Sequence, residues 1–390
     1  MNIIDSILQT DLYKLTMQQC VYHQYPSAEA TYSFKCRNEN IYLGVLASRI
    51  QEQIERMKYL SLTNEEKKYL QGINFLKKDY LDYLAGYRFN PQQVKVRDHH
   101  GVLEIDIAGS WLETILWEVP LLAIVNQLYF EDNSNFDNSN FKDLKEEGER
   151  RLAEKISVIQ GYPRFQFVDF GTRRRYSRNW QEKVIRDFRS HCPQLIGTSN
   201  IKFAMDMGIK AIGTQAHEYI SAHIAFVDNI REAQKRALYV WLQEYGTNLG
   251  IALTDTFTTE AFFQDFDYTL AHSFSGVRQD SGDPFIFGKK MIEYYKNLGI
   301  DPRTKTIVFS DGLDIPKAIK LWKEFTGQVG LSFGIGTNLT NDMGLEPLNI
   351  VIKLVSCNGK PVVKLSDNPT KAIGDKKVIE DIKKAYYLIF

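Results

Sequence analysis

Short β-rich apolar runs alternate with helical stretches from about residue 160 onward, and this alternation constrains the fold more than any other feature. The intervening stretches carry helix-capping residues, such as Asp283 before Pro284 and Asp314 further on. The seven apolar runs span residues 165–169, 195–198, 210–214, 251–255, 271–277, 305–310 and 330–335. Strands that alternate with helices form parallel sheets covered by helices. Seven repeats therefore predict a (β/α) barrel, complete or irregular.

The two ends of the chain predict a smaller second domain. Residues 48–85 have helical apolar spacing, and a strand is expected near 103–107. Residues 350–366 are typical of a β-hairpin, because Asn358-Gly359 favours a type I′ turn between apolar alternating strands. We expect an α/β fold in which residues 111–349 form an irregular barrel. Residues 1–110 and 350–390 would together form a smaller α/β domain, resembling an α+β sandwich, packed on that barrel.

Residues 131–141 are polar and contain two adjacent copies of Asp-Asn-Ser-Asn-Phe. We expect an exposed loop here. A helix is predicted over 228–245, with Gly246 at its end.

Balanced charge excludes several classes of protein. Lys and Arg together number 48, and Asp and Glu also number 48, so the formal net charge is zero. A nucleic-acid-binding protein would carry a basic excess, and a disordered chain would combine high net charge with low hydrophobicity. With 44% hydrophobic residues, this chain is expected to be globular and to bind no nucleic acid.

Cysteine spacing and apolar run lengths bear on location. No two of the four cysteines lie within four residues of each other, which gives neither a zinc motif nor a disulfide framework. The longest uninterrupted apolar run in the most apolar region, residues 119–125, is far shorter than the ~20 residues of a membrane helix. The N-terminus shows no signal-peptide pattern. A cytoplasmic protein without a membrane partner is the expectation.

Polar residues follow each predicted strand. In a barrel the carboxyl ends of the strands converge on one mouth, where barrel enzymes keep their active sites. Arginine, glycine, threonine and carboxylates at such a mouth suit a phosphorylated substrate. The residues that follow the strands include Phe170, Gly171, Arg173, Ser199, His217, Asp255, Arg278, Asp280, Asp311, Gly312, Gly336 and Thr337.

Each motif also has a simpler structural interpretation. Gly336-Thr337 could cradle a phosphate or form an ordinary tight turn, and Leu339 stands where a dinucleotide fingerprint needs glycine. Arg173 belongs to a run of three arginines that could be a solvated surface cluster. Arg278 and Asp280 form the most specific local pattern, and we assign the chemistry to them.

His217 and the N-terminal pair Asp11 and Tyr13 are ambiguous on their own. His217-Glu218 lacks the second histidine of a zinc protease motif, and a lone histidine in the first turn of a helix is more often structural. Asp11 and Tyr13 by themselves indicate only a helix cap and a packed tyrosine.

Taken together, these residues resemble the nicotinate phosphoribosyltransferase family, in the type II phosphoribosyltransferase group. The matching segments run in family order over nearly the whole chain. They are residues 10–16 (TDLYKLT), 169–174 (DFGTRR), 197–199 (GTS), 213–218 (GTQAHE), 278–283 (RQDSGD), 310–312 (SDG) and 334–337 (GIGT).

The resemblance implies an enzyme of NAD biosynthesis that joins nicotinate to phosphoribosyl pyrophosphate, giving nicotinate mononucleotide and pyrophosphate. It implies ATP hydrolysis coupled through a transient phosphohistidine at His217, and Mg²⁺ bound with the diphosphate rather than at a fixed metal site. Asp280 and Asp311 resemble the catalytic carboxylates. The residues expected at phosphoribosyl pyrophosphate are Asp11, Arg278, Asp280, Asp311, Gly312, Gly336 and Thr337.

The resemblance also implies how nicotinate is bound. Phe170 and Tyr13 would sandwich the pyridine ring, with Arg173 nearby. Nicotinamide-using relatives place Asp where this chain has Ser199, and a serine can donate to a carboxylate, which favours nicotinate. A nicotinamide phosphoribosyltransferase and a non-catalytic barrel that binds phosphorylated metabolites are the alternatives. A homodimer that shares Asp11 and Tyr13 between subunits is a further possibility implied by dimeric relatives.

Overall fold

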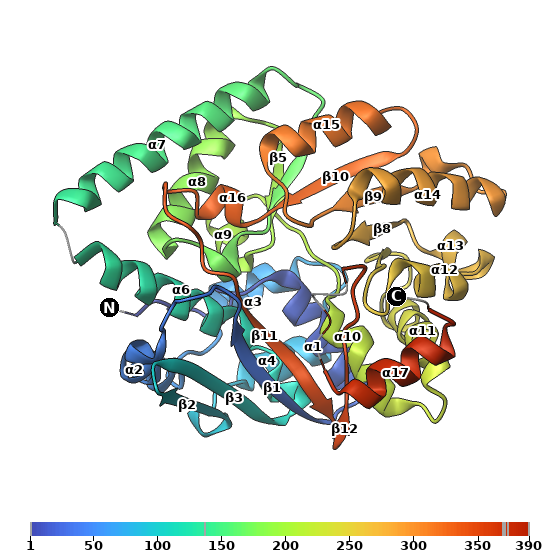
Figure 1. The fold of residues 1–390 in the computed structure, drawn as a ribbon, viewed down its shortest axis with the longest axis horizontal. Helices are drawn as coiled ribbons and strands as arrows, with labels where there is room; N and C mark the ends of the chain where they lie inside the picture. Colours follow the sequence, from blue (N-terminus) through green and yellow to red (C-terminus); the bar gives the residue numbers. More distant parts are fainter. Residues whose placement is uncertain (1, 136–137, 369–371, 373, 389–390) are drawn as a thin grey trace.

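The chain folds into two separate β-sheets, and strands from its N-terminal and C-terminal parts pair in one of them (Figure 1). The computed structural model describes residues 2–135, 138–368, 372 and 374–388. One sheet has seven strands and the other has five. The general expectation of a mixed α/β fold with two sheets is confirmed. The proposed domain boundaries at residues 110 and 350 stay a prediction.

The seven-stranded sheet is parallel throughout. Its order is β6-β5-β4-β10-β9-β8-β7, which is chain order around a ring that is cut between β6 and β7. Its strands are β4 (Phe167–Asp169), β5 (Leu195–Thr198), β6 (Lys210–Ala211), β7 (Ile251–Leu253), β8 (Gly276–Gln279), β9 (Thr306–Phe309) and β10 (Gly330–Ile335).

The cut between β6 and β7 leaves the ring open. Within the described residues no backbone ladder joins these two strands. Side chains bridge them instead, since Thr214 Oγ1 donates to the carbonyl of Ile251 at 3.3 Å and Gln215 Nε2 donates to the same oxygen at 3.5 Å. The predicted barrel is therefore a curled sheet, and a complete TIM-like ring is not formed. Strands of two and three residues at the seam are too short to close it.

Helices connect the parallel strands and cover the curled sheet (Figure 1). The two predicted caps are confirmed: Asp283 accepts from the amides of Phe285 and Ile286, and Asp314 accepts from that of Lys317. The helices are α7 (Asn138–Gln160), α8 (Arg178–His191), α9 (Ile201–Met207), α10 (His217–Ala222), α11 (Ala233–Tyr245), α12 (Thr259–Asp265), α13 (Tyr268–Ser273), α14 (Pro284–Asn297), α15 (Ile315–Phe325) and α16 (Thr337–Thr340). Short 3₁₀ helices are η3 (Thr172–Arg174), η4 (His223–Phe226), η5 (Ile230–Glu232) and η6 (Pro302–Thr304).

Three sequence predictions need correction. The expected strand at 271–277 begins only at Gly276, because Asp267 caps α13 through the amide of Leu270 and draws the apolar residues before Gly276 into a helix. The helix expected from 228 begins as η5 and continues as α11. The expected loop at 131–141 is helical at 131–135 in α6 and at 138–141 in α7, and residues 136–137 lie outside the described residues. Residues 131–135 and 138–141 contain neither Gly nor Pro, the two residues least favourable in a helix, so their polar composition is compatible with helix.

The five-stranded antiparallel sheet joins the two ends of the chain. Its order is β12-β11-β1-β3-β2, so C-terminal β11 pairs directly with N-terminal β1. The predicted turn is confirmed, since Asn358 and Gly359 have φ of 47° and 72° between β11 and β12. The strands are β1 (Glu29–Cys36), β2 (Val94–His99), β3 (Val102–Ser110), β11 (Ile350–Cys357) and β12 (Lys360–Pro361).

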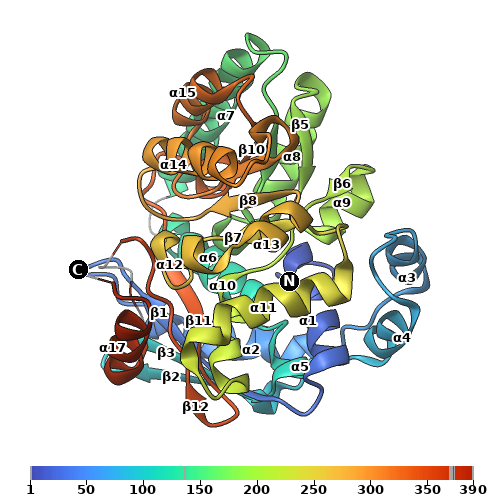
Figure 2. The same cartoon turned by 90° about the vertical axis from the view of Figure 1, so that its right-hand side faces the viewer.

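The remaining helices lie around the antiparallel sheet or between it and the curled sheet. Figure 2 shows the curled sheet above and the antiparallel sheet below, with α1, α10 and α11 between or beside them. The helices outside the connections of the curled sheet are α1 (Leu12–Gln24), α2 (Ala47–Met57), α3 (Asn64–Gln71), α4 (Lys78–Gly86), α5 (Trp111–Thr114), α6 (Glu118–Asn135) and α17 (Lys376–Ala385), with the 3₁₀ helices η1 (Gly44–Leu46) and η2 (Pro91–Gln93).

The N-terminal segment is bonded to the curled sheet. The amide of Leu12 donates to the carbonyl of Ser199 at 2.8 Å, and that of Ile201 donates to the carbonyl of Thr10 at 3.0 Å. Further along α1, Thr16 Oγ1 donates to the carbonyl of Thr214 beside the open seam. The start of α1 is thus fixed at the carboxyl ends of β5 and β6.

Among the helices that the structure describes, none combines the length and the apolar character needed to cross a bilayer. The cytoplasmic location stays a prediction.

Candidate active site

A cavity of about 590 Å³ opens at the carboxyl ends of the parallel strands. Its opposite wall comes from the antiparallel sheet, through Val351 and Lys353 of β11 and through Arg37 beyond β1. All twelve residues predicted for the site line this cavity, whereas the role of each stays a prediction. They are Asp11, Tyr13, Phe170, Arg173, Ser199, His217, Arg278, Asp280, Asp311, Gly312, Gly336 and Thr337.

His217, the first residue of α10, is paired with a buried carboxylate. Its Nε2 lies 3.0 Å from Asp255 Oδ1 and 3.7 Å from Asp280 Oδ2. Burial lowers the pKa of His217 to about 4, and Lys364 reinforces this shift while Asp255 opposes it. The imidazole is therefore neutral at neutral pH and carries a lone pair.

Asp255 is held as an anion on the side away from His217. Its Oδ2 accepts from Ser281 Oγ at 2.6 Å and lies 3.2 Å from Lys364 Nζ. Burial alone would raise the pKa of Asp255, but Lys364 and His217 hold it well below its ordinary value. An ionised Asp255 accepts the Nε2 proton of His217 and so fixes the tautomer of the ring.

Asp280 and Arg278 form the next part of the wall. Asp280 Oδ1 accepts from Ser310 Oγ at 2.7 Å, and its Oδ2 lies 3.6 Å from Arg278 Nη2. Burial raises the pKa of Asp280, but nearby positive charge, chiefly that of Arg278, lowers it below its ordinary value. The carboxylate is ionised and faces the cavity, where it can accept from hydroxyl groups.

His217, Asp255 and Asp280 are close enough together to be considered as ligands of a metal ion. Ligand atoms of His217, Asp255 and Asp280 lie within 4.8 Å of one another. However, Lys364 and Arg278 already neutralise the two carboxylates, and Nε2 of the histidine is hydrogen-bonded. A cation would have to displace these partners.

Gly334 and Gly336 shape the end of β10 around an aromatic ring. A Cβ on Gly334 would lie 2.3 Å from the Phe170 ring, so only glycine admits the ring at this place. The amide of Phe170 donates to the carbonyl of Ile335 at 2.8 Å. Gly334 thus positions Phe170, and the phosphate cradle at Gly336-Thr337 stays a prediction.

Arg173 lies between an aromatic ring and a buried acid. Its guanidinium carbon is 6.0 Å from the centre of the Tyr13 ring, and its Nη1 is 3.5 Å from Glu118 Oε1. Glu118 in turn lies 2.6 Å from Lys14 Nζ, which also contacts Glu218 Oε2. This buried network links α1, α6 and α10 behind the cavity.

Ser199 and Asp11 are hydrogen-bonded to each other. Ser199 Oγ donates to Asp11 Oδ1 at 2.7 Å. The Ser199 hydroxyl is expected to donate to the nicotinate carboxylate, yet in this structure its one hydrogen is directed at Asp11. Asp11 and Tyr13 line the cavity of their own chain, so these positions are filled without a second subunit.

Family models match both parts of the chain. The model described as the nicotinate phosphoribosyltransferase (NAPRTase) family matches residues 165–388, and that of its N-terminal domain matches residues 8–126.

The chain belongs to the nicotinate phosphoribosyltransferase family.

Similar proteins agree over the full length. The nicotinate phosphoribosyltransferase of Pectobacterium carotovorum is 45% identical over 388 residues, covering 99% of this chain and 96% of that protein. The enzyme of Cupriavidus necator is 47% identical over 379 residues, covering 96% of this chain and 95% of that protein. The crystal structure of the Vibrio cholerae nicotinate phosphoribosyltransferase aligns with a TM-score of 0.91 at 38% identity, covering 100% of this chain and 95% of that one.

Membership of the nicotinate phosphoribosyltransferase family confirms the predicted enzyme and its place in NAD biosynthesis. The alternative of a non-catalytic metabolite-binding barrel finds no support among these relatives, and neither does that of a nicotinamide-specific enzyme. The family does not by itself assign roles to individual residues of this chain.

Several residues that line the cavity of this family member were not predicted from the sequence. Arg174 belongs to the run of three arginines that contains Arg173, and it too lines the cavity. Lys353 occupies an alternate position of β11 beside inward-facing Ile352 and Leu354, a period-two signal that places it on the other face. The cations added by the structure are Arg37, Arg174, Lys353 and Lys364.

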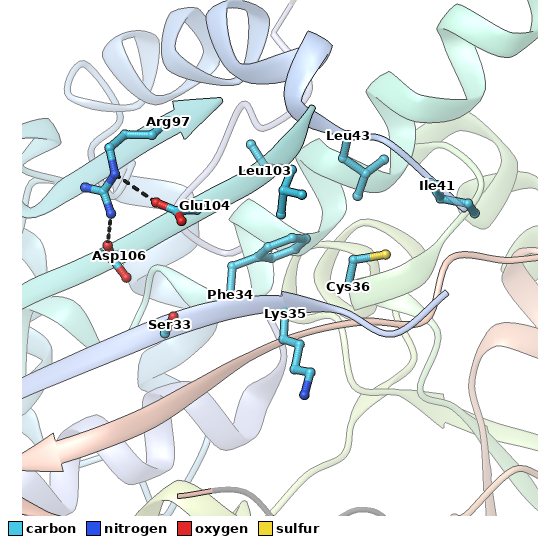
Figure 3. A pocket seen from close by; sticks show the side chains of 11 residues that line it. Ser33, Phe34, Lys35, Cys36, Ile41, Leu43, Arg97, Leu103, Glu104 and Asp106 are labelled. Carbon is cyan, nitrogen blue, oxygen red and sulfur yellow. Dashed lines mark hydrogen bonds and ion pairs between the residues drawn. The ribbon is translucent and has the colours of Figure 1, made fainter. Parts of the chain in front are cut away.

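A second pocket, of about 340 Å³, lies over the antiparallel sheet (Figure 3). Phe34, Leu43 and Leu103 form its apolar part. On its rim Arg97 donates to Glu104 at 3.1 Å and also to Asp106, so these charges satisfy one another. None of the twelve predicted residues, all of them described, lines this pocket.

Proposed function

We propose that the chain couples phosphoribosyl transfer to ATP hydrolysis through a transient phosphohistidine at His217. The observation that carries this proposal is the pairing of His217 with ionised, buried Asp255 at 3.0 Å. Because Asp255 accepts the proton on Nε2, the lone pair of the ring resides on Nδ1. A bond then forms between Nδ1 and the γ-phosphorus, the bond from that phosphorus to the bridging oxygen breaks, and ADP leaves.

The electrostatics around His217 favour this step. Burial lowers the pKa of His217 to about 4, so nearly every molecule holds a nucleophilic, uncharged ring at neutral pH. Lys364 and Arg278 line the same cavity and supply positive charge for an incoming polyphosphate. Water hydrolyses the phosphohistidine after phosphoribosyl transfer and regenerates the free imidazole.

The transfer step uses the remainder of the cavity. Phe170 and Tyr13 hold the pyridine ring of nicotinate, with Arg173 beside it. Asp280 and Asp311 hold the ribose hydroxyls and the Mg²⁺ that accompanies the diphosphate of the substrate. Asp11, Arg278, Gly312, Gly336 and Thr337 complete the contacts with phosphoribosyl pyrophosphate.

Charge neutralisation and orientation account for the chemistry of transfer. The pyridine nitrogen attacks C1 of the ribose, the bond from C1 to the diphosphate oxygen breaks, and positive charge develops on the sugar. The diphosphate leaves with additional negative charge on its oxygen. Arg37 and Lys353 face the cavity from the wall opposite the strand ends, Arg174 lines it from η3 after β4, and Lys364 lines it beside Asp255. All four cations are proposed to stabilise that charge.

Labelled ATP tests the phosphohistidine. Incubation with γ-labelled ATP and Mg²⁺ is expected to give a protein-bound phosphate that is acid-labile, base-stable and on Nδ1 after alkaline digestion. His217→Ala abolishes the label, whereas His191→Ala, at an exposed histidine of α8, keeps it. Full nicotinate mononucleotide formation that is independent of ATP, with no label, would overturn the coupling.

A homodimer is also proposed, without a shared site. Asp11 and Tyr13 already occupy the cavity of their own chain, so a dimer would not be required to supply them. Sedimentation equilibrium at assay concentration measures the oligomeric state directly, and a monomer with full activity would exclude any need for a partner subunit.

A further inference from the structure

Backbone contacts between the segments that contain Asp11 and Ser199 hold these two residues together. Asp11 forms an isolated antiparallel bridge with Asn200, and the amide of Leu12 donates to the carbonyl of Ser199 at 2.8 Å. Both side chains are almost fully buried, with 2% and 3% exposed, yet both line the cavity. The backbone thus fixes their oxygen atoms 2.7 Å apart.

The position of one proton decides what this pair presents to a substrate. A serine hydroxyl has one hydrogen and two lone pairs. If Asp11 is ionised, Ser199 must donate to it, and Ser199 then offers only lone pairs to the cavity. Lone pairs suit the N–H groups of an amide and oppose a carboxylate. If Asp11 is protonated, it donates to Ser199, whose hydrogen becomes free for a carboxylate.

We propose that Asp11 binds nicotinate in its protonated form, taking one proton from solvent, and that this proton makes Ser199 a donor to the substrate carboxylate. Asp11 is then a specificity-determining residue that acts through Ser199. The proposal rests on the use of nicotinate by this family and on the predicted contact of Ser199 with its carboxylate. The proton forms an O–H bond on the Asp11 carboxylate and is given up by hydronium or a buffer acid; every other change is an exchange of hydrogen bonds.

The surroundings of Asp11 are consistent with proton uptake. Burial raises the pKa of Asp11, and Glu118 of α6 raises it further, whereas Arg173 of η3 and the hydroxyls of Ser199 and Thr172 lower it. A nicotinate carboxylate would add a second negative charge beside Asp11 and shift the balance toward the protonated form. The other charged or titratable groups that interact with Asp11 are Tyr13 of α1, Asp169 of β4 and Arg175.

Opposite pH dependences for two substrates test the proposal. KM for nicotinate is measured from about pH 6 to 9 at saturating ATP and phosphoribosyl pyrophosphate, where the nicotinate carboxyl stays ionised. We expect KM for nicotinate to rise about tenfold per pH unit above the pKa of Asp11, with little change in kcat. The inhibition constant of nicotinamide as a competitor should fall over the same range. A purely structural role for Asp11 would not give opposite slopes.

Substitutions of Asp11 and Ser199 test the role of the Asp11 proton separately. In Asp11→Asn the amide nitrogen donates permanently to Ser199, so the variant should bind nicotinate with a KM that does not change with pH. Ser199→Ala should raise KM for nicotinate at every pH, and Ser199→Thr, which keeps the hydroxyl, should restore it. Circular dichroism of each variant verifies folding.

Three outcomes would overturn the proposal. One is a KM for nicotinate that depends on pH in folded Asp11→Asn in the same way as in the wild type. Another is a rise in KM for phosphoribosyl pyrophosphate with no change in KM for nicotinate, which would limit Asp11 to its proposed contact with phosphoribosyl pyrophosphate. If Asp11→Asn does not fold, calorimetry of the wild-type enzyme with nicotinate in two buffers of different ionisation enthalpy decides: about one proton taken up supports the proposal, and none overturns it. Failure of nicotinate turnover at all pH values would instead contradict the enzyme assignment.

Discussion

Nε2 of His217 lies 3.0 Å from Oδ1 of Asp255, and the two residues come from different βα connections of the curled sheet. His217 begins α10 after β6, and Asp255 follows β7, so the pair spans the open seam between these strands. A complete ring of backbone hydrogen bonds is therefore not required to align them. The seam is where the chain brings together the proposed nucleophile and the carboxylate that is proposed to orient it.

Asp255→Asn should slow phosphorylation of His217 by about 10²–10⁴-fold, because an amide no longer fixes the proton on Nε2. The rate is measured in single turnovers with γ-labelled ATP. Because Lys364 loses its buried partner, the variant is also expected to unfold at lower urea concentration. Asp206→Asn, at an exposed carboxylate of α9 that is paired with Lys202, serves as the control and should label at the wild-type rate. A labelling rate unchanged by Asp255→Asn would remove Asp255 from the mechanism.

Gly334→Ala should raise KM for nicotinate by about 10- to 100-fold, because the new methyl group would displace the Phe170 ring that is proposed to hold the pyridine. Overpacking of this kind costs about 1–3 kcal/mol of stability. Steady-state kinetics and urea unfolding measure the two effects. Gly86→Ala at the end of α4 is the matched control, since a Cβ there meets nothing within 4 Å. Equal effects at the two glycines would disprove the steric role of Gly334.

Topology explains why much of the site could be predicted from sequence. Once the strands are parallel, residues that follow them must meet at one edge, and this brings Phe170, Ser199, His217, Asp280 and Thr337 together regardless of loop details. The same reasoning left closure of the ring open, because pairing between strands of two and three residues depends on tertiary packing and leaves no periodic signal in the sequence.

Residues outside the parallel strands were harder to predict. Successive residues of β11 point to opposite faces of the antiparallel sheet. Only the placement of that sheet relative to the curled sheet decides that the face with Lys353 meets the cavity. Lys14, Glu118 and Glu218 are charged residues that usually remain at the surface, so a buried network of all three has no sequence signature. Residues 131–141 show the converse, because a polar composition alone did not distinguish loop from helix.

Lys14→Met should destabilise the fold by about 3–5 kcal/mol, because it leaves the carboxylates of Glu118 and Glu218 buried without their shared cation. Urea unfolding followed by circular dichroism measures the change. Lys58→Met, which removes an exposed partner of Glu55, is the control and should show no measurable change. Since Glu118 also contacts Arg173, the Lys14 variant should also bind nicotinate more weakly at the proposed ring site. Stability within error of the wild type would show that the two acids are neutralised in another way.

Lys353 should make pyrophosphate binding depend on pH. Burial lowers the pKa of Lys353 to about 7, with Lys364 and Arg37 contributing like charge. Below this value the ammonium is charged and attracts the diphosphate, and above it the amine is neutral, so affinity is expected to fall as pH rises through about 7 to 8. Calorimetric titration with Mg²⁺ and pyrophosphate measures the dependence. Lys353→Met should flatten this part of the profile at weak affinity, whereas Lys353→Arg, which keeps its charge, should flatten it at strong affinity. Identical profiles in all three proteins would exclude Lys353 from the diphosphate site.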